Sequence, residues 1–254
     1  MPSISRSGVE IYFEVNGSGP AILLSHGYAA TTAMWKGQLD AFSRNHTLIT
    51  WDMRGHGQSD SPGSASEYSA NHTIEDMAAL LDELNIVDAT IGGLSLGGYM
   101  SLEFHRTFED RVNALLIIDT GPGFKSDESR NAWNVHANGT ADVLSRNGLE
   151  SLLGRTPEMA QSKHRSLEGL VLAGRHMLTQ QNANVIESLP SISKPTLVVV
   201  GAEDKPFRNA SDYMAKKIPG AKMSVIANAG HAVNIDQPDE FNRVVLDFLS
   251  KQGL

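Results

Sequence analysis

The sequence predicts an α/β fold, in which a largely parallel sheet carries helices on both faces and a helical segment is inserted late in the chain. Short apolar runs alternate with helical patterns over most of the sequence. Several runs are continuously apolar, as strands buried on both faces are. The alternation stops between about Gly121 and Leu189. The predicted strands are residues 9–15, 21–25, 47–51, 89–92, 114–119, 196–200 and 222–227.

Length and composition bound the class of protein. The chain has 254 residues, a net charge of −8 and no cysteine. Its length suits one domain with an insertion. The negative charge, with no dense Lys/Arg cluster, argues against a nucleic-acid partner. Without cysteine there is no disulfide, thiolate metal site or Cys nucleophile. Residues 1–10 lack the apolar core of a signal peptide, and no apolar run is long enough to span a membrane, so we expect a cytoplasmic protein. The sequence does not indicate the oligomeric state.

Helical patterns lie between and after the strands. Residues 73–76 resemble a capping box before an apolar periodic run, and a second amphipathic helix closes the chain. Residues 122–189 are expected to form a helical cap over the carboxyl edge of the sheet, which is where open α/β sheets bind ligands. Within this segment, helical stretches are predicted at residues 141–153 and 166–178. Residues 1–121 and 190–254 form the core. The alternative is a run of ordinary packing helices.

The pentapeptide around Ser95 predicts a nucleophile elbow. Gly93 and Gly97 flank this serine, an apolar strand precedes it, and a helical pattern follows. In such a turn the strand and helix backbones approach too closely for a Cβ, and the serine hydroxyl stands clear of the sheet. The alternative is a glycine-rich turn with an incidental serine.

A serine hydroxyl needs a base within hydrogen-bond reach and an acid that orients the base. His231 lies on a loop after the last predicted strand, and we expect it to be the base. Asp204 and Asp119 both end strands, and either satisfies the chain order serine, acid, histidine. Asp204 is favoured because it follows a strand and a glycine turn, while Asp119 is expected to cap structure or to line the pocket. Glu203 is the weaker neighbour.

An acyl-transfer intermediate carries an oxyanion, which requires fixed N–H donors. The backbone N–H of Leu96, directly after the serine, is one expected donor. The backbone N–H of Tyr28, in the loop after the strand 21–25, is the other. Ser25 and His26 are expected to brace that loop.

These landmarks together resemble an α/β-hydrolase-fold serine hydrolase over essentially the full length. They are the loop 26–28, the stretch 52–59 (DMRGHGQS), the serine turn, residues 201–204 and Gly230-His231. The resemblance implies an eight-stranded sheet with the cap after the sixth strand. It also implies a Ser95–His231–Asp204 triad under a lid. It makes Asp52, Arg54 and His56 scaffold residues, and neither a cofactor nor a metal is expected. The alternative, a metal held by Asp52, His56 and Asp60, lacks a further ligand cluster.

The family contains many activities, so the fold does not fix the reaction. Dehalogenases and epoxide hydrolases of this fold attack with an aspartate, whereas position 95 is a serine. We therefore expect hydrolysis of a small carboxylic ester or lactone, with a rate that falls below about pH 6 as His231 becomes protonated. The pocket is expected to be mostly apolar, with Tyr28, Leu96 and Trp133 in its walls. A C–C bond hydrolase, a slow-turnover ligand sensor and cofactor-free oxygen chemistry remain the alternatives.

Overall fold

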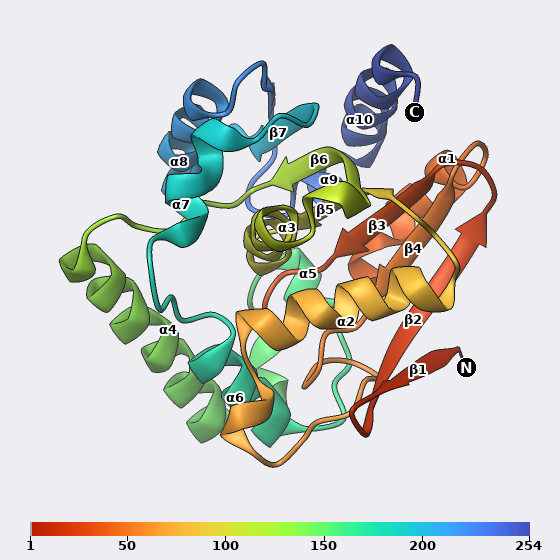
Figure 1. Cartoon of the computed structure of the whole chain (residues 1–254). Coiled ribbons are helices and arrows are strands. Elements are labelled where there is room, and N and C mark those ends of the chain that lie inside the picture. The colour runs from red at the N-terminus through yellow and green to blue at the C-terminus, as the bar shows by residue number, and fades with distance from the viewer. Residues whose placement is uncertain (1) are drawn as a thin grey trace.

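The computed structural model describes residues 2–254 and contains one eight-stranded sheet, which confirms the predicted fold class (Figure 1). The strand order is β1-β2-β4-β3-β5-β6-β7-β8. β1 and β2 run antiparallel to their neighbours, and the six strands β3 to β8 pair in parallel. The strands are β1 (Ser3–Arg6), β2 (Val9–Gly17), β3 (Ala21–Ser25), β4 (Thr47–Trp51), β5 (Ala89–Leu94), β6 (Val112–Ile118), β7 (Thr196–Gly201) and β8 (Lys222–Ile226).

Helices cover both faces of the sheet. In Figure 1, α2 and α3 lie on one side, and α1 and α10 lie on the other. The α-helices are α1 (Leu39–Phe42), α2 (Ala70–Glu83), α3 (Leu96–Thr107), α4 (Asp127–Asn147), α5 (Pro157–Ala160), α6 (Leu167–His176), α7 (Asn184–Ser188), α8 (Lys205–Lys217), α9 (Val233–Asp236) and α10 (Pro238–Gln252). Short 3₁₀ helices cover Thr32–Gln38, Ala65–Glu67, Glu109–Arg111, Leu149–Leu152 and Leu189–Ser191. None of the helices within residues 2–254 combines the length and the apolarity that a membrane crossing needs.

The core is divided into two layers by the sheet. In β6, Leu115 and Ile117 belong to the layer under α2 and α3, whereas Leu116 and Ile118 belong to the layer under α10. Successive side chains of a strand point to opposite faces, so a strand covered on both faces is apolar at every position. This is why the continuous apolar runs in the sequence predict these strands well.

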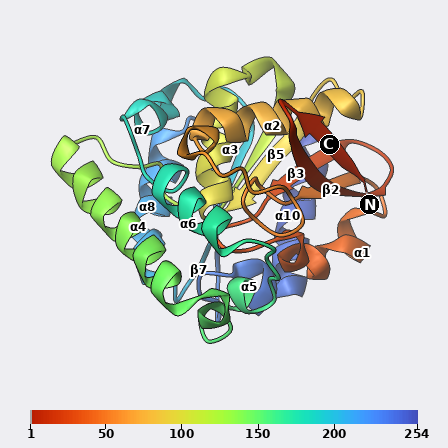
Figure 2. The same cartoon turned by 90° about the horizontal axis from the view of Figure 1, so that it is seen from below.

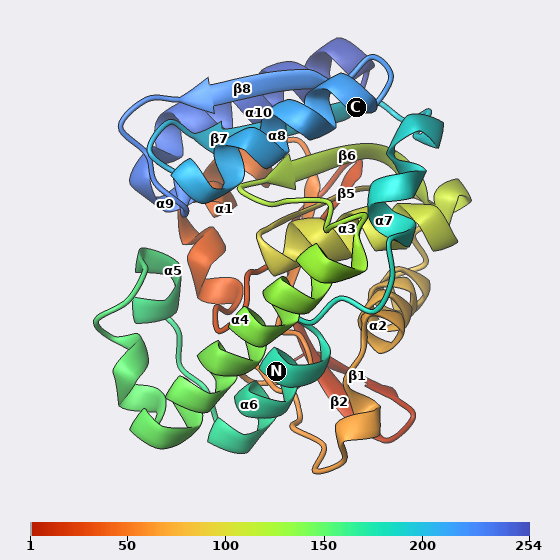
Figure 3. The same cartoon turned by 90° about the vertical axis from the view of Figure 1, so that its left-hand side faces the viewer.

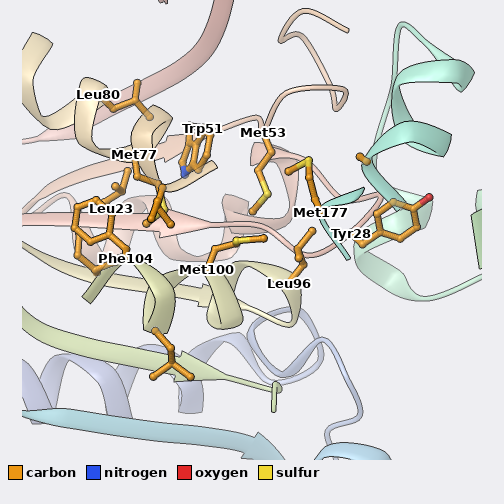
Figure 4. Close-up of a cluster of buried hydrophobic side chains, with 14 of the residues drawn as sticks. Leu23, Tyr28, Trp51, Met53, Met77, Leu80, Leu96, Met100, Phe104 and Met177 are labelled. Carbon is orange, nitrogen blue, oxygen red and sulfur yellow. The ribbon is translucent and has the colours of Figure 1, made fainter. Parts of the chain in front are cut away.

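The segment between β6 and β7 consists of helices α4 to α7 and contains no strand. α4 and α6 lie side by side in Figures 2 and 3. The hydrophobic core continues from the sheet towards this segment, where Met177 lies near Met53 and Tyr28 (Figure 4). The Tyr28 hydroxyl donates to the carbonyl of Leu170 at 2.9 Å, which ties α6 to the loop after β3.

The helical segment also approaches the core closely at Gly55 and Gly57. A Cβ at Gly55 would lie 2.7 Å from the carbonyl oxygen of Gly169 in α6. The backbone N–H of Gly57 also donates to Nδ1 of His164 at 3.0 Å, and His164 Nε2 lies 3.1 Å from the carbonyl oxygen of Ala29. These contacts join the helical segment to two core loops.

Some element boundaries differ from the sequence-based expectation. Helix α2 begins at Ala70, because Ser69 Oγ accepts the N–H of His72, and Thr73 lies inside the helix with its hydroxyl bonded to the carbonyl of Ser69. The expected capping box at residues 73–76 is therefore wrong. α4 begins at Asp127 rather than near residue 141, since its largely polar surface hides the helical period. β1 was not predicted, because Ile4 is its one buried residue.

Candidate active site

Ser95 lies in a sharp turn between β5 and α3. Its backbone has φ +55° and ψ −115°, a conformation that a non-glycine residue adopts only under strain. Surrounding hydrogen bonds hold the turn in place: the N–H of Ser95 donates to the carbonyl of Ile118 at 2.9 Å, and the Thr120 hydroxyl donates to the carbonyl of Ser95 at 2.7 Å. The side chain of Ser95 is partly exposed.

The glycines around Ser95 are required by close backbone contacts. A Cβ at Gly93 would lie 2.5 Å from the carbonyl carbon of Gly97, and one at Gly97 would lie 2.2 Å from the carbonyl oxygen of Ser25. A Cβ at Gly98 would meet the side chain of Thr120 at 2.6 Å. Real Cβ contacts are not this short, so the turn can form only with glycine at these positions.

Asp204 and His231 come together at the ends of neighbouring strands. Asp204 follows β7 and His231 follows β8, and Oδ2 of the aspartate lies 2.8 Å from Nδ1 of the histidine. The carboxylate is almost completely buried, and the imidazole is 24% exposed. This contact fixes the proton on Nδ1 of the neutral ring and leaves Nε2 as the acceptor nitrogen.

The groups around His231 determine the pKa of its imidazole. Burial lowers the pKa of His231, but the hydrogen bond and the charge of Asp204 outweigh burial, and the net effect raises the pKa above its usual value. The charges of Asp119 and of Glu158, which is buried in α5, act in the same direction. The ring of Phe207 stacks on the imidazole with centroids 5.0 Å apart, which holds the ring plane.

Asp119 is buried between the two loops that carry Asp204 and His231. Its Oδ1 accepts the N–H of Gly201 at 2.8 Å, and its Oδ2 accepts the N–H of Val233 at 3.2 Å. Burial raises the pKa of Asp119 well above its usual range. With both oxygens bonded to backbone, this carboxylate joins the end of β7 to the start of α9.

The loop after β3 approaches Ser95 from the other side. His26 donates from Nδ1 to the carbonyl of Gly27 at 2.7 Å and accepts the N–H of Met53 on Nε2 at 2.9 Å. A Cβ at Gly27 would lie 3.5 Å from the Cβ of Ser95. Within residues 2–254, the backbone N–H groups of Tyr28 and Leu96 make no hydrogen bond. These two donors are the ones expected to bind an oxyanion.

A cavity of about 410 Å³ opens beside Ser95. Its wall combines core residues with residues of the helical segment, including Leu96 and Trp133 as expected, and no charged side chain of the described chain lines it. Tyr28 and Asp119, also expected in the wall, are buried outside it. The lining residues are Ser95, Leu96, Tyr99, Thr120, Gly121, Pro122, Gly123, Phe124, Trp133, Leu178, Gln180, Ile186, Pro206, Phe207, Asn209, Ala210 and Tyr213.

The structure places Ser95, Asp204 and His231 at the carboxyl ends of β5, β7 and β8, on one edge of the sheet. Within residues 2–254, Ser95 Oγ and His231 make no hydrogen bond. The expected contact between Asp204 and His231 is therefore formed, whereas the expected contact between Ser95 and His231 is not. Such contacts often tighten only when a substrate binds.

The stretch 52–59 is bound into the core. The carboxylate of Asp52 accepts the N–H groups of Thr32 and Gln58, each at 2.8 Å. The buried guanidinium of Arg54 forms two hydrogen bonds to Asp76, at 2.8 and 2.7 Å. No group of three or more His, Asp or Glu side chains in residues 2–254 is arranged to hold a metal ion.

Three residues near the site are not among those that the sequence predicts. Phe207 stacks on His231, Glu158 is buried with one carboxylate oxygen unpartnered within residues 2–254, and Gln180 lines the cavity. Glu158 and Gln180 belong to the helical segment, whose placement depends on contacts far apart in the chain. Only the position of Phe207, three residues after the predicted acid, could have suggested a role.

Known proteins resemble the chain over almost its whole length. The sequence is 29% identical to 3-oxoadipate enol-lactonase 1 of Acinetobacter baylyi, over 96% of this chain and 95% of that protein. Among solved structures, an esterase from Thermogutta terrifontis superimposes with a TM-score of 0.85 at 27% identity, covering 98% of this chain and 97% of the other. The enol-lactonase from Burkholderia xenovorans superimposes with a TM-score of 0.80 at 27% identity, covering 98% and 100%.

The characteristic sequence pattern of the alpha/beta hydrolase family matches residues 22–244, which include the serine turn, Asp204 and His231. This match spans most of the chain, and the fold and the structural neighbours agree with it. The chain therefore belongs to the alpha/beta hydrolase family.

Proposed function

We propose that this hydrolase cleaves an uncharged carboxylic ester or lactone through an acyl-enzyme on Ser95. The observation that carries the proposal is the 2.8 Å contact between Asp204 and His231, at the same sheet edge as a serine held at positive φ. A strained serine turn beside an oriented imidazole is the arrangement that activates a hydroxyl at neutral pH. Both an esterase and an enol-lactonase are among the structural relatives, and both names agree with this reaction.

In the first half of the reaction, Ser95 Oγ attacks the substrate carbonyl carbon while Nε2 of His231 takes the hydroxyl proton. Asp204 keeps the ring in the required tautomer and stabilises the imidazolium. The carbonyl oxygen becomes an oxyanion, and the N–H groups of Tyr28 and Leu96 donate to it. Fixed donors of this kind lower the barrier by about 3 kcal/mol each. The intermediate then expels the alkoxide, which takes the proton from His231.

In the second half, a water molecule attacks the acyl-enzyme carbonyl while Nε2 of His231 takes a proton from the water. The tetrahedral intermediate expels Ser95 Oγ, which recovers its proton from His231. The products are the carboxylic acid and the alcohol, which for a lactone are the two ends of one hydroxy acid. Every proton transfer uses the same nitrogen.

The wall of the cavity favours an uncharged substrate. A buried carboxylate on the substrate needs a cationic or strongly donating partner, because removing a charge from water is costly. The described cavity wall has no lysine, arginine or histidine, and is formed largely by aromatic and aliphatic side chains. A volume of about 410 Å³ is in the range of small-molecule sites.

A substrate screen tests the proposal. Purified protein is assayed with p-nitrophenyl esters of increasing acyl length and with neutral lactones, and Ser95→Ala serves as the control. Multiple turnovers that Ser95→Ala abolishes support the proposal. Turnover that survives in Ser95→Ala, or a single slow turnover as a ligand sensor gives, contradicts it.

A further inference from the structure

The hydroxyl of Thr120 is bonded to the backbone of the serine turn. Its Oγ1 donates to the carbonyl oxygen of Ser95 at 2.7 Å, and the residue is 3% exposed. The same Oγ1 lies 3.5 Å from the carbonyl oxygen of Gly121, so the one proton of the hydroxyl is directed to Ser95. The carbonyl of Ser95 also accepts the N–H of Tyr99 at 3.0 Å, and its two lone pairs accommodate both bonds.

The carbonyl of Ser95 belongs to the same peptide group as the N–H of Leu96. A trans peptide group is planar, so its C=O and its N–H point in opposite directions from one rigid unit. The direction of that unit is set by the ψ angle of Ser95, which is −115° in a strained conformation. A hydrogen bond that holds the carbonyl of Ser95 therefore also fixes the direction in which the N–H of Leu96 points.

Thr120 is itself held in place from two sides. It follows Asp119, whose carboxylate oxygens accept the N–H groups of Gly201 and Val233 at 2.8 and 3.2 Å. Its methyl group packs on α3, where a Cβ at Gly98 would lie 2.6 Å from Cγ2 of Thr120. The hydroxyl is therefore presented to the serine turn from a fixed position.

We infer that Thr120 is a positioning residue for the oxyanion site, because its hydroxyl holds the peptide group that carries the Leu96 donor. This inference rests on the proposed function and deepens it. Accepting the bond from Thr120 draws electron density to the carbonyl oxygen of Ser95, which makes the N–H of Leu96 a stronger donor. The oxyanion exists only in the tetrahedral intermediates and the transition states beside them, so the bond acts on the rate and not on the binding of the substrate.

A matched pair of substitutions isolates the hydroxyl. Thr120→Ser and Thr120→Ala both remove the methyl group, and only the alanine also removes the hydroxyl. Thr120→Val removes the hydroxyl but keeps the volume of the side chain. Thr73→Ser and Thr73→Ala are the controls, because Thr73 is buried in α2 and its hydroxyl also donates to a backbone carbonyl, that of Ser69, at 2.9 Å. Urea unfolding of each variant shows that it is folded.

Two measurements separate an effect on the oxyanion from a general disturbance of the cavity. The first is kcat/KM for the p-nitrophenyl ester that wild type cleaves fastest. The second is the affinity for two ketones that carry the acyl group of that ester. A trifluoromethyl ketone adds to Ser95 and forms an oxyanion, whereas the corresponding methyl ketone binds as a neutral carbonyl.

Relative to Thr120→Ser, we expect Thr120→Ala to lower kcat/KM by roughly 10- to 100-fold, which is less than the loss of an oxyanion donor costs, because the Leu96 N–H is misdirected and not removed. Affinity for the trifluoromethyl ketone falls by the same factor, whereas affinity for the methyl ketone changes by less than about threefold. Thr120→Val behaves as Thr120→Ala does. The two Thr73 variants keep the kinetics of wild type.

Different results overturn the two proposals. Equal kcat/KM in Thr120→Ser and Thr120→Ala overturns the role of Thr120 and leaves ester hydrolysis standing. An equal loss of affinity for the two ketones does the same, because it shows that the cavity as a whole is disturbed. Failure of wild type to hydrolyse any ester, together with failure of Ser95 to react with a fluorophosphonate, overturns the proposed function itself.

Discussion

Oδ2 of Asp204 lies 2.8 Å from Nδ1 of His231, and the buried carboxylate of Asp119 joins the two loops that hold them there. The two aspartates therefore have different tasks. Asp204 contacts the imidazole directly, whereas Asp119 bonds to the backbone of Gly201 and Val233. Sequence position alone allows either one to be the acid.

Asparagine substitutions distinguish the two aspartates. Asp204→Asn places an amide N–H against Nδ1–H of His231, which destroys the tautomer of His231 that leaves Nε2 free to accept a proton. We therefore expect kcat/KM to fall by roughly 10³- to 10⁴-fold with little change in stability. Asp119→Asn leaves a backbone N–H without an acceptor, and we expect it to lower the free energy of unfolding by about 1–3 kcal/mol. Ester kinetics and urea unfolding measure the two effects. Near-normal kinetics in Asp204→Asn, with an inactive but folded Asp119→Asn, contradicts the assignment.

The pH dependence of kcat/KM reports on His231. Protonated His231 cannot take the proton of Ser95, so log kcat/KM falls with unit slope below its pKa. Because Asp204 and the nearby carboxylates raise that pKa, we expect the midpoint above 6.5, higher than the value near pH 6 expected from the sequence. Glu158→Gln removes one of the negative charges and should move the midpoint to lower pH. A flat rate below pH 6.5 excludes His231 as the base.

Two buried histidines, His26 and His56, and the half-buried His164 make stability dependent on acid. Burial lowers the pKa of His26 and of His164 to about 4, and that of His56 well below its usual value. The unfolded chain binds these protons near pH 6.5, so the free energy of unfolding falls as pH drops from about 6.5 to about 4. His164→Asn should reduce this slope in urea titrations at each pH. An unchanged slope excludes His164 as a contributor.

Gly97 tests the packing of the serine turn. Gly97→Ala places a methyl group against the carbonyl of Ser25, and we expect it to lower the free energy of unfolding by about 1–3 kcal/mol and to reduce activity. Gly139→Ala is the matched control, because Gly139 lies in α4 with open space around it. That substitution should raise stability by about 0.5–1 kcal/mol. Equal effects of the two substitutions contradict the packing argument.

The sequence predicts the sheet and the candidate site better than it predicts the helical segment. The strands at residues 21–25 and 47–51 match β3 and β4 at both ends, because buried parallel strands are continuously apolar. Ser95, Asp204 and His231 are found from local patterns, since each follows a strand that the sequence already marks. β1 is missed because one of its four residues is buried.

The residues of the helical segment could not be placed in the same way. Gln180 reaches the cavity through hydrogen bonds to Asn134, 46 positions earlier in the chain, and the loop that receives it depends on Gly123. Tyr28 is turned away from the cavity by its bond to Leu170, 142 positions later. Contacts of this range leave no periodic or local signal in the sequence.

The most direct test of the account is covalent labelling of Ser95. Intact protein is treated with a fluorophosphonate, and mass spectrometry of its peptides locates the adduct, with His231→Ala as a control that retains the serine. The account predicts one adduct, on Ser95, formed rapidly in wild type and at least about 10³-fold more slowly in His231→Ala. An adduct on another residue, or ester hydrolysis that continues once Ser95 carries the adduct, contradicts it.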